Sequence, residues 1–161
     1  MPYPSLDKHA DYILKHVAQR VAYERELDFV GTEHILLAIL RHNQGIGAKV
    51  LRRFQVNEQR ASEEVDRIVR QDMEDTWVFG RLPGSPHYRN VMALAIDEAA
   101  QLESPRIGSE HLLLALLRER GSTAARVLEA MGVKLENARA ETVRQLERLH
   151  GGDRPNAAGG G

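Results

Sequence analysis

Apolar residues recur along this chain at helical spacing. Between residues 13 and 22 they fall at steps of three and four, at Ile13, Leu14, Val17, Ala18, Val21 and Ala22. This spacing places one apolar stripe along a helix. Val, Ile and Thr never alternate with polar residues over the length of a strand, so we expect no sheet. The pattern therefore predicts an all-α fold.

A second pattern is an internal repeat. Residues 31–41 read GTEHILLAILR and residues 108–118 read GSEHLLLALLR, so Gly31 recurs as Gly108 at an offset of 77 residues. The same offset aligns Leu14 with Val91 and Val56 with Val133 without a gap. Two unrelated helices can share an apolar pattern, but not this polar start at one fixed offset. The chain is therefore a tandem duplication.

Each copy is expected to contain four helices. The motif helix should begin with Thr32 or Ser109 as the N-cap, because a hydroxyl there accepts a hydrogen bond from the first turn. The run that follows is apolar almost all round, which is typical of a buried central helix. A third helix is predicted at about 46–54 and 123–131. A fourth is predicted at about 57–71 and 135–149, with an apolar stripe that includes Val143, Leu146 and Leu149.

These elements give the expected domain boundaries. Repeat one covers about 6–71 and repeat two about 85–149, and together they form one compact domain within 1–150. An inter-repeat loop is expected at about 72–84, where acidic residues precede Trp77 and Phe79 and several Gly and Pro residues follow. Residues 151–161 are rich in glycine and are expected to be a flexible tail or linker stump.

Composition narrows the classes of function. The 161 residues include 22 Lys and Arg against 23 Asp and Glu, so there is no basic footprint for nucleic acid. No apolar run approaches the roughly 18 residues of a membrane span. The first residues lack a basic segment followed by an apolar stretch, so we do not expect them to be a secretory signal. The chain has no cysteine, which excludes disulfides, thiol nucleophiles and cysteine-ligated zinc. We therefore expect a cytoplasmic domain that binds neither membrane nor nucleic acid.

The duplicated motif resembles the Clp N-terminal (Clp repeat) domain family. Residues 31–40 with GIGAKVL at 45–51 are similar to the first half of that domain, and residues 108–117 with AARVL at 124–128 are similar to the second. The resemblance covers about 6–149 and is closest to the N-domain of ClpC-type unfoldases. It implies two four-helix repeats related by a pseudo-two-fold axis. A filled two-repeat core gives no reason to dimerise, so we expect the isolated domain to be a monomer. The resemblance also implies Clp ATPase or protease subunits, adaptor proteins and substrate proteins as partners.

The sequence contains no ATPase module, because no Gly-x-x-x-x-Gly-Lys-Ser/Thr loop occurs. The leading hypothesis is a non-enzymatic module that binds substrates or adaptors for a Clp unfoldase–protease and needs no cofactor. The alternative is a free-standing accessory subunit that docks on the Clp complex and modulates it without binding substrate. An enzyme is disfavoured, since no nucleophile–base pair, paired catalytic carboxylates or metal constellation appears.

The resemblance implies a ligand site at the motif glutamates, Glu33 and Glu110. In some ClpC relatives the two repeat glutamates hold the guanidinium of phosphorylated arginine, and nearby helix N-termini suit its phosphate. The predicted site includes the neighbouring hydroxyls of Thr32, Ser109 and Ser85. The alternative is that both glutamates only stabilise a helix start, where the dipole favours an anion.

The two copies differ at the start of their first helix. In copy two, Ser85 precedes Pro86 and offers a hydroxyl to a phosphate. In copy one the corresponding start reads Ser5-Leu6-Asp7-Lys8, and its alignment needs a one-residue shift. Asp7 near a phosphate would repel it unless Lys8 compensates. The copy-one site is therefore the weaker candidate.

Histidines and aromatic residues supply the remaining candidates. His34 and His111 lack metal-ligand spacing, so we expect them to pack at the repeat interface with local hydrogen bonds. His9 and His16 are expected at the surface. Trp77 and Phe79 are candidates for a protein contact, and the favoured alternative is that they fold back on the core.

Overall fold

A computed structural model describes residues 5–27, 29–79 and 86–152, with side chains for all of these except 71–79, 86, 151 and 152. Repeat one contains α1 (Lys8–Tyr12), the π-helical turn η1 (Ile13–Val17), α2 (Ala18–Glu24), α3 (Thr32–His42), α4 (Ile46–Arg53) and α5 (Glu58–Phe79). Repeat two contains α6 (Pro86–Gln101), α7 (Ser109–Arg118), α8 (Thr123–Ala130) and α9 (Leu135–Gly152). These described residues form no strand, only an isolated bridge between Leu6 and Ile107. The all-α prediction is confirmed.

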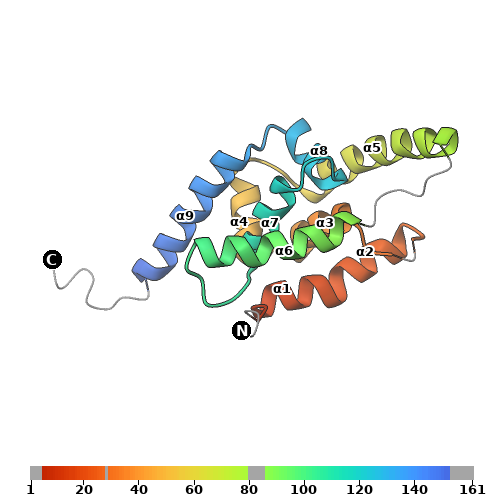
Figure 1. Ribbon diagram of the computed structural model, residues 1–161. Coiled ribbons are helices and arrows are strands. Elements are labelled where there is room, and N and C mark those ends of the chain that lie inside the picture. Colours follow the sequence, from red (N-terminus) through yellow and green to blue (C-terminus); the bar gives the residue numbers. More distant parts are fainter. Residues whose placement is uncertain (1–4, 28, 80–85, 153–161) are drawn as a thin grey trace, which may run out of the picture.

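The central helices α3 and α7 lie in the middle of the core. Every residue from His34 to Leu40 and from Ser109 to Leu117 is buried. The two helices contact each other, and all the other helices pack around them or against their neighbours (Figure 1). Their apolar character all round is explained by this position, because neither has a face left for water.

The two repeats are interleaved. The third helix of each repeat contacts the central helix of the other, α4 against α7 and α8 against α3. The fourth helices cross over as well, since α5 packs on α8 and α9 packs on α4. The starts of the first helices follow the same rule, with α1 against α7 and α6 against α3. This exchange produces the pseudo-two-fold arrangement, and each repeat completes the core of the other.

The first helices of the two repeats differ by one residue. In repeat one a continuous helical run from Lys8 to Glu24 contains the π turn η1, whereas α6 is α-helical throughout. A single π turn accommodates one additional residue in a helix. It therefore accounts for the one-residue shift between Asp7 and Ser85, although the offset from Leu14 onward is constant.

Helix α5 corrects one predicted boundary. It runs to Phe79, so the first half of the loop expected at about 72–84 is helical. Residues 71–79 contain neither Gly nor Pro, and nothing in their sequence ends the helix before Gly80. Helix α9 similarly continues to Gly152, two residues into the predicted tail. The side chains of Trp77 and Phe79 and the whole of Ser85 lie outside the described residues, so their predicted roles stay predictions.

Candidate functional site

The central helices begin in the same way. Gly31 and Gly108 are the N-cap residues, with extended backbone at φ −101° and −106°. The backbone N–H of each glycine donates to a histidine three residues on, at 2.8 Å from His34 Nδ1 and from His111 Nδ1. This is the returning half of a capping box, in which histidine takes the place of Glu or Gln.

Thr32 and Ser109 are therefore not N-caps, and that prediction was wrong. The glycine before each already adopts the extended N-cap conformation. Ser109 Oγ accepts a hydrogen bond from the Gly47 N–H at 2.9 Å, and Thr32 Oγ1 accepts one from the Ala124 N–H at 3.2 Å. These N–H groups lie in the first turns of α4 and α8, where they have no partner within their own helix. Each hydroxyl thus joins its central helix to the other repeat.

His34 and His111 are buried and form the local hydrogen bonds that were predicted for them. They are 0% and 1% exposed, and burial lowers the pKa of each to about 4. Because Nδ1 accepts a hydrogen bond, the proton of the neutral ring is on Nε2. His111 Nε2 donates to Ser104 Oγ at 3.1 Å. His34 Nε2 is buried without a hydrogen-bond partner in the described structure.

His9 departs from its predicted surface position. It is half-buried, and its Nδ1 lies 2.9 Å from His42 Nε2. His16 is exposed, as expected, beside the ring of Tyr12. Among the side chains that the structure describes, we find no group of three or more acidic or histidine residues that could hold a metal ion.

The motif glutamates fold back over the glycines that precede them. A Cβ on Gly31 or Gly108 would overlap the carboxylate of Glu33 or Glu110, so a larger residue at either N-cap would displace that carboxylate. Glu110 is 5% exposed, whereas the Glu33 side chain is 12% exposed. Burial raises the pKa of Glu110 to about 7, its own backbone N–H partly opposes the shift, and the carboxylate of Asp7 adds to it.

Asp7 belongs to the second-repeat site and not to the first. A Cβ added to Gly108 would lie 2.7 Å from Asp7 Oδ2 and would overlap Glu110 Oε1. The two carboxylates therefore meet above this glycine. The Asp7 N–H donates to the Ile107 carbonyl at 2.8 Å, and its Oδ1 caps α1 by accepting from the Ala10 N–H at 2.8 Å. The interleaved fold thus brings the first helix of repeat one to the glutamate of repeat two.

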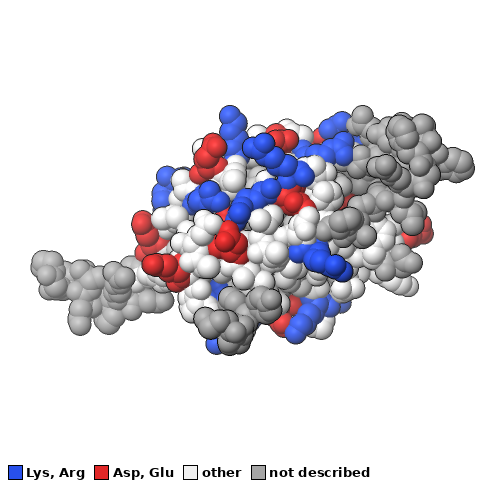
Figure 2. Space-filling view, in the orientation of Figure 1, with Lys and Arg blue, Asp and Glu red and all other residues white. Residues whose placement is uncertain are grey.

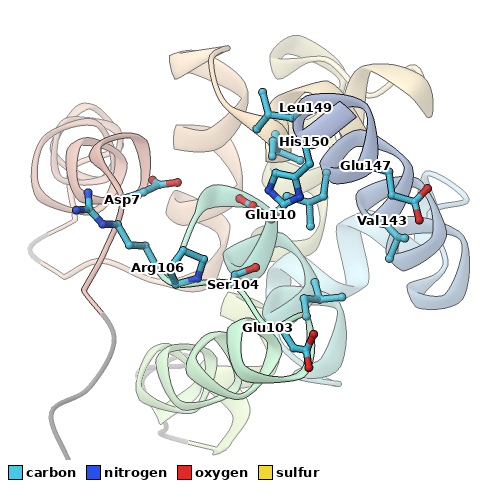
Figure 3. Close-up of a pocket in the computed structure, with 13 residues that line it drawn as sticks. Asp7, Glu103, Ser104, Arg106, Glu110, Val143, Glu147, Leu149 and His150 are labelled. Atoms are coloured by element: carbon cyan, nitrogen blue, oxygen red, sulfur yellow. The ribbon is translucent and has the colours of Figure 1, made fainter. Parts of the chain in front are cut away.

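A cavity of about 420 Å³ opens beside Glu110. Its apolar walls come from the start of α4, the loop before α7 and the last turns of α9, and consist of Ile46, Leu102, Pro105, Val143, Leu146 and Leu149. Its ionisable lining consists of Asp7, Glu103, Glu110, Glu147, Arg106 and His150, and Figure 3 shows the Glu110 carboxylate between Asp7 on one side and α9 on the other. The lining therefore contains four carboxyl groups, one guanidinium and one imidazole.

The sequence did not reveal this cavity. Val143, Leu146 and Leu149 were expected to form the apolar stripe of the fourth helix, and instead they line the cavity, with Leu149 48% exposed. The one sequence signal for a ligand surface was an apolar stripe that continues to the last turn of a helix before a Gly-rich segment.

Elsewhere several charged side chains form ion pairs with one another. Arg139 bonds the buried Glu98, and Arg144 bonds the buried Glu141 at 2.9 Å. Lys and Arg are interspersed with Asp and Glu over the face shown in Figure 2. In the part of the chain that the structure describes, no helix has the length and apolar character needed to cross a membrane.

Comparison with known proteins assigns the fold to a family. The model of the Clp repeat (R) N-terminal domain matches residues 6–83 and again 83–159. The chain is 36% identical over 146 residues to the ATP-dependent Clp protease ATP-binding subunit ClpC of Staphylococcus saprophyticus subsp. saprophyticus, covering 91% of this chain and 17% of that protein. It is 39% identical over 145 residues to the chloroplastic chaperone protein ClpC2 of Oryza sativa subsp. japonica, covering 90% of this chain and 15% of that protein.

A solved structure agrees with this assignment. The N-terminal domain of the chaperone ClpD from Arabidopsis thaliana superposes with a TM-score of 0.65 at 18% identity, over 91% of this chain and 97% of that one. At this identity the likeness concerns the fold. The duplicated motif, the two interleaved four-helix repeats and the two successive matches agree, and the chain belongs to the Clp repeat N-terminal domain family.

Proposed function

We propose that this chain is a protein-binding module that receives segments of substrate or adaptor proteins for a Clp unfoldase–protease. The observation that carries the proposal is the cavity beside Glu110, which combines an apolar wall with a buried carboxylate. Such a combination is typical of sites that bind a side chain and fix its orientation with a few polar groups. The relatives named above are ATP-binding subunits and chaperones, and this chain spans less than a fifth of their length. The unfoldase partner is therefore part of the proposal.

Within this proposal the predicted site residues have different roles. Glu110 contacts the bound segment directly. Ser109 and Thr32 act indirectly, because their hydroxyls hold the starts of α4 and α8 in place. Glu33 is the corresponding candidate in repeat one. Phosphoarginine, which the family resemblance suggested as a ligand, is part of this proposal, with its guanidinium next to Glu110.

The apolar rim of the cavity provides a direct test. The full chain is titrated into a fluorescein-labelled unfolded model protein, carboxymethylated α-lactalbumin, and binding is followed by anisotropy. We expect Leu149→Asp to weaken binding by about tenfold, because it places a charge on an apolar contact surface. Tyr23→Asp is the matched control, since Tyr23 is 82% exposed and does not line the cavity.

Equal binding by the wild type and both variants would contradict the proposed site. A pull-down from a lysate containing a Clp complex distinguishes the alternative. Recovery of Clp ATPase or protease subunits without client proteins, together with no binding to the unfolded model protein, would assign the chain the accessory role instead.

A further inference from the structure

A second cavity lies between α4 and α9, which pack side by side (Figure 1). It has a volume of about 360 Å³, and we call it the α4–α9 pocket. Its lining consists of Arg53, Phe54, Asn137, Ala140, Glu141 and Arg144. We propose that the α4–α9 pocket binds the carboxylate of an Asp or Glu side chain in an acidic segment of a partner protein. This inference goes beyond the proposed function, because it concerns a second contact surface.

The α4–α9 pocket is separate from the cavity beside Glu110. The two share no lining residue, although α9 contributes to both. Ala140 and Arg144 are four residues apart and lie on one face of α9, whereas Val143 and Leu146 are three residues apart and lie on another. A ligand in one opening therefore leaves the other free.

The pocket holds two guanidiniums around one buried carboxylate. The Glu141 side chain is 4% exposed, and its Oε1 accepts from Arg144 Nη2 at 2.9 Å and Nε at 3.2 Å. Arg53 Nε lies 3.6 Å from the same oxygen. Burial opposes the ionisation of Glu141, but hydrogen bonds from Gln145 and Arg144 and the charges of Arg144 and Arg53 lower its pKa. Two positive charges and one negative charge leave the lining with one positive charge in excess.

Both guanidiniums keep N–H donors that Glu141 does not use. A guanidinium has five such donors. Arg144 bonds Glu141 through Nε and Nη2, so the N–H groups of Nη1 are outside this contact. Arg53 is farther from Glu141 than the length of a hydrogen bond. The Arg53 and Arg144 side chains are 69% and 61% exposed, so a ligand from solvent reaches both. The planar fork of a guanidinium fits a carboxylate.

The remaining lining residues favour a carboxylate on a short apolar stem. Phe54 is half-buried against the core, and Ala140 is exposed beside it, so the charged groups adjoin an apolar surface. Asn137 adds an exposed amide that can donate a hydrogen bond. A phosphate carries up to about two negative charges, and its second charge would be repelled by Glu141. The single excess positive charge therefore matches a carboxylate better.

The equivalent place in repeat one lacks the second guanidinium. There α5 packs on α8 as α9 packs on α4, and the ion pair recurs between Arg67 and Glu64. At the offset of 77 residues, however, Arg53 corresponds to Ala130. One Arg–Glu pair is therefore common to both repeats and is part of the frame. The added charge of Arg53 is what makes the α4–α9 pocket suited to an anion.

The test uses three peptides of sequence Ala-Leu-X-Leu-Ala, blocked at both ends, in which X is glutamate, glutamine or phosphoserine. Each is titrated into the full chain, and backbone amide NMR shifts give both the affinity and the location. We expect the glutamate peptide to shift the signals of Arg53, Phe54 and Arg144. The glutamine peptide should bind there about fivefold more weakly, because charge-assisted hydrogen bonds are lost at an exposed site. The phosphoserine peptide should bind no more tightly than the glutamate peptide.

A pair of variants assigns the effect to the pocket. Arg53→Gln removes the guanidinium that is not hydrogen-bonded to Glu141, so we expect the fold to remain intact. It should weaken the glutamate peptide by about fivefold and leave the glutamine peptide unchanged. Arg67→Gln is the matched control, because Arg67 is 60% exposed and the variant changes the net charge equally. It should bind the glutamate peptide as the wild type does.

Unchanged signals of Arg53, Phe54 and Arg144 with every peptide would overturn this inference, as would equal binding of the glutamate and glutamine peptides. A phosphoserine peptide that binds about tenfold more tightly than the glutamate peptide would assign the pocket to phosphate instead. Equal losses in Arg53→Gln and Arg67→Gln would show that only the overall charge matters. None of these results decides the proposed function, which depends on the effect of Leu149→Asp on the unfolded model protein.

Discussion

The start of α3 and the start of α7 are built on the same frame and surrounded differently. Both have a glycine N-cap, a histidine that accepts from the glycine N–H at 2.8 Å, and a hydroxyl bonded to the other repeat. These shared contacts hold the backbone and join the repeats. The residues around the frame have diverged, because they are not needed to begin the helix.

The divergence has given repeat two the richer polar site. His111 has Ser104 as a partner for Nε2, and Glu110 has Asp7 beside it and a cavity in front of it. In repeat one, Leu27 occupies the sequence position equivalent to Ser104, and His34 Nε2 has no partner in the described structure. Duplication thus preserved the structural half of the motif and left the ligand-facing half free to change.

The largest expected effect comes from removing the histidines. His34→Ala and His111→Ala should each cost about 3 kcal/mol, because each deletes a buried ring and a helix-capping hydrogen bond. His111→Ala should cost about 1 kcal/mol more, since it also breaks the bond to Ser104, whereas His34 already has an unsatisfied N–H. Urea unfolding at pH 7 measures the loss of stability in each of the two variants. A larger loss from His34→Ala would contradict the comparison.

Substitution by glutamine should have opposite effects on the stability of the fold at the two motif glutamates, Glu110 and Glu33. Glu110 has a pKa of about 7 in the fold against 4.5 in the unfolded chain, so the folded state binds the extra proton between these pH values. Stability due to this group is full below pH 4.5 and is lost as pH rises to 7. Glu110→Gln should therefore stabilise the fold by about 2–3 kcal/mol at pH 8 and hardly at all at pH 4.5.

Glu33→Gln is the matched control. It should cost about 0.3–1 kcal/mol at pH 8, because it removes a negative charge from the first turn of a helix. The midpoints of urea unfolding at pH 4.5 and pH 8, compared with those of the wild type, measure the effect of each variant on stability. Destabilisation by Glu110→Gln at pH 8 would show that the buried carboxylate is satisfied in a way that the structure does not contain.

A third pair of substitutions compares α4 and α8, the helices that each contact the central helix of the other repeat. A Cβ on Gly47 would lie 2.8 Å from the Ser109 carbonyl oxygen, so Gly47→Ala should cost about 2 kcal/mol through overpacking. The equivalent residue in repeat two is Ala124, and Ala124→Gly should cost only about 1 kcal/mol from lost helix propensity. Thermal unfolding followed by circular dichroism compares the two, and a neutral Gly47→Ala would show that α4 shifts to make room.

The smallest expected effect comes from giving His34 Nε2 the hydrogen-bond partner that it lacks. Leu27→Ser places a hydroxyl at the position equivalent to Ser104, where the backbone N–H of each residue makes the same 2.9 Å bond to the preceding helix. His34→Ala should then cost about 1 kcal/mol more in the Leu27→Ser background than in the wild type. A double-mutant cycle in urea gives this coupling energy, and a value of zero would mean that the two histidines are not equivalent.

Helix content and duplication could be predicted from the sequence because they depend on local spacing. Apolar residues at steps of three and four indicated the helices, and one fixed offset indicated the repeat. The N-caps were misplaced by one residue, since a Gly-Thr or Gly-Ser pair offers two good capping residues in succession. The helix boundary at 71 was wrong because acidic residues before Trp77 suggested a loop, although none of them stops a helix.

Only part of the candidate site could be predicted from the sequence. Glu33 and Glu110 stood out because they recur in a motif, and their burial is a property of the folded core. Asp7 was assigned to the glutamate of its own repeat, since the sequence does not show that the repeats exchange helices. The cavity walls come from α4, α9 and the loop before α7, which lie far apart along the chain, so no local pattern could indicate them.

The π turn η1 has a consequence for how the two halves of the molecule became different. Each residue of an α-helix is rotated by about 100° from the one before it, so an inserted residue changes the angular phase of everything on its far side. Deleting one residue within Ile13–Val17 would turn Asp7 by that angle about the axis of the first helix and move its carboxylate away from Glu110. An insertion in a helix, and not only the exchange of one side chain for another, thus sets the charge of the site in the opposite repeat.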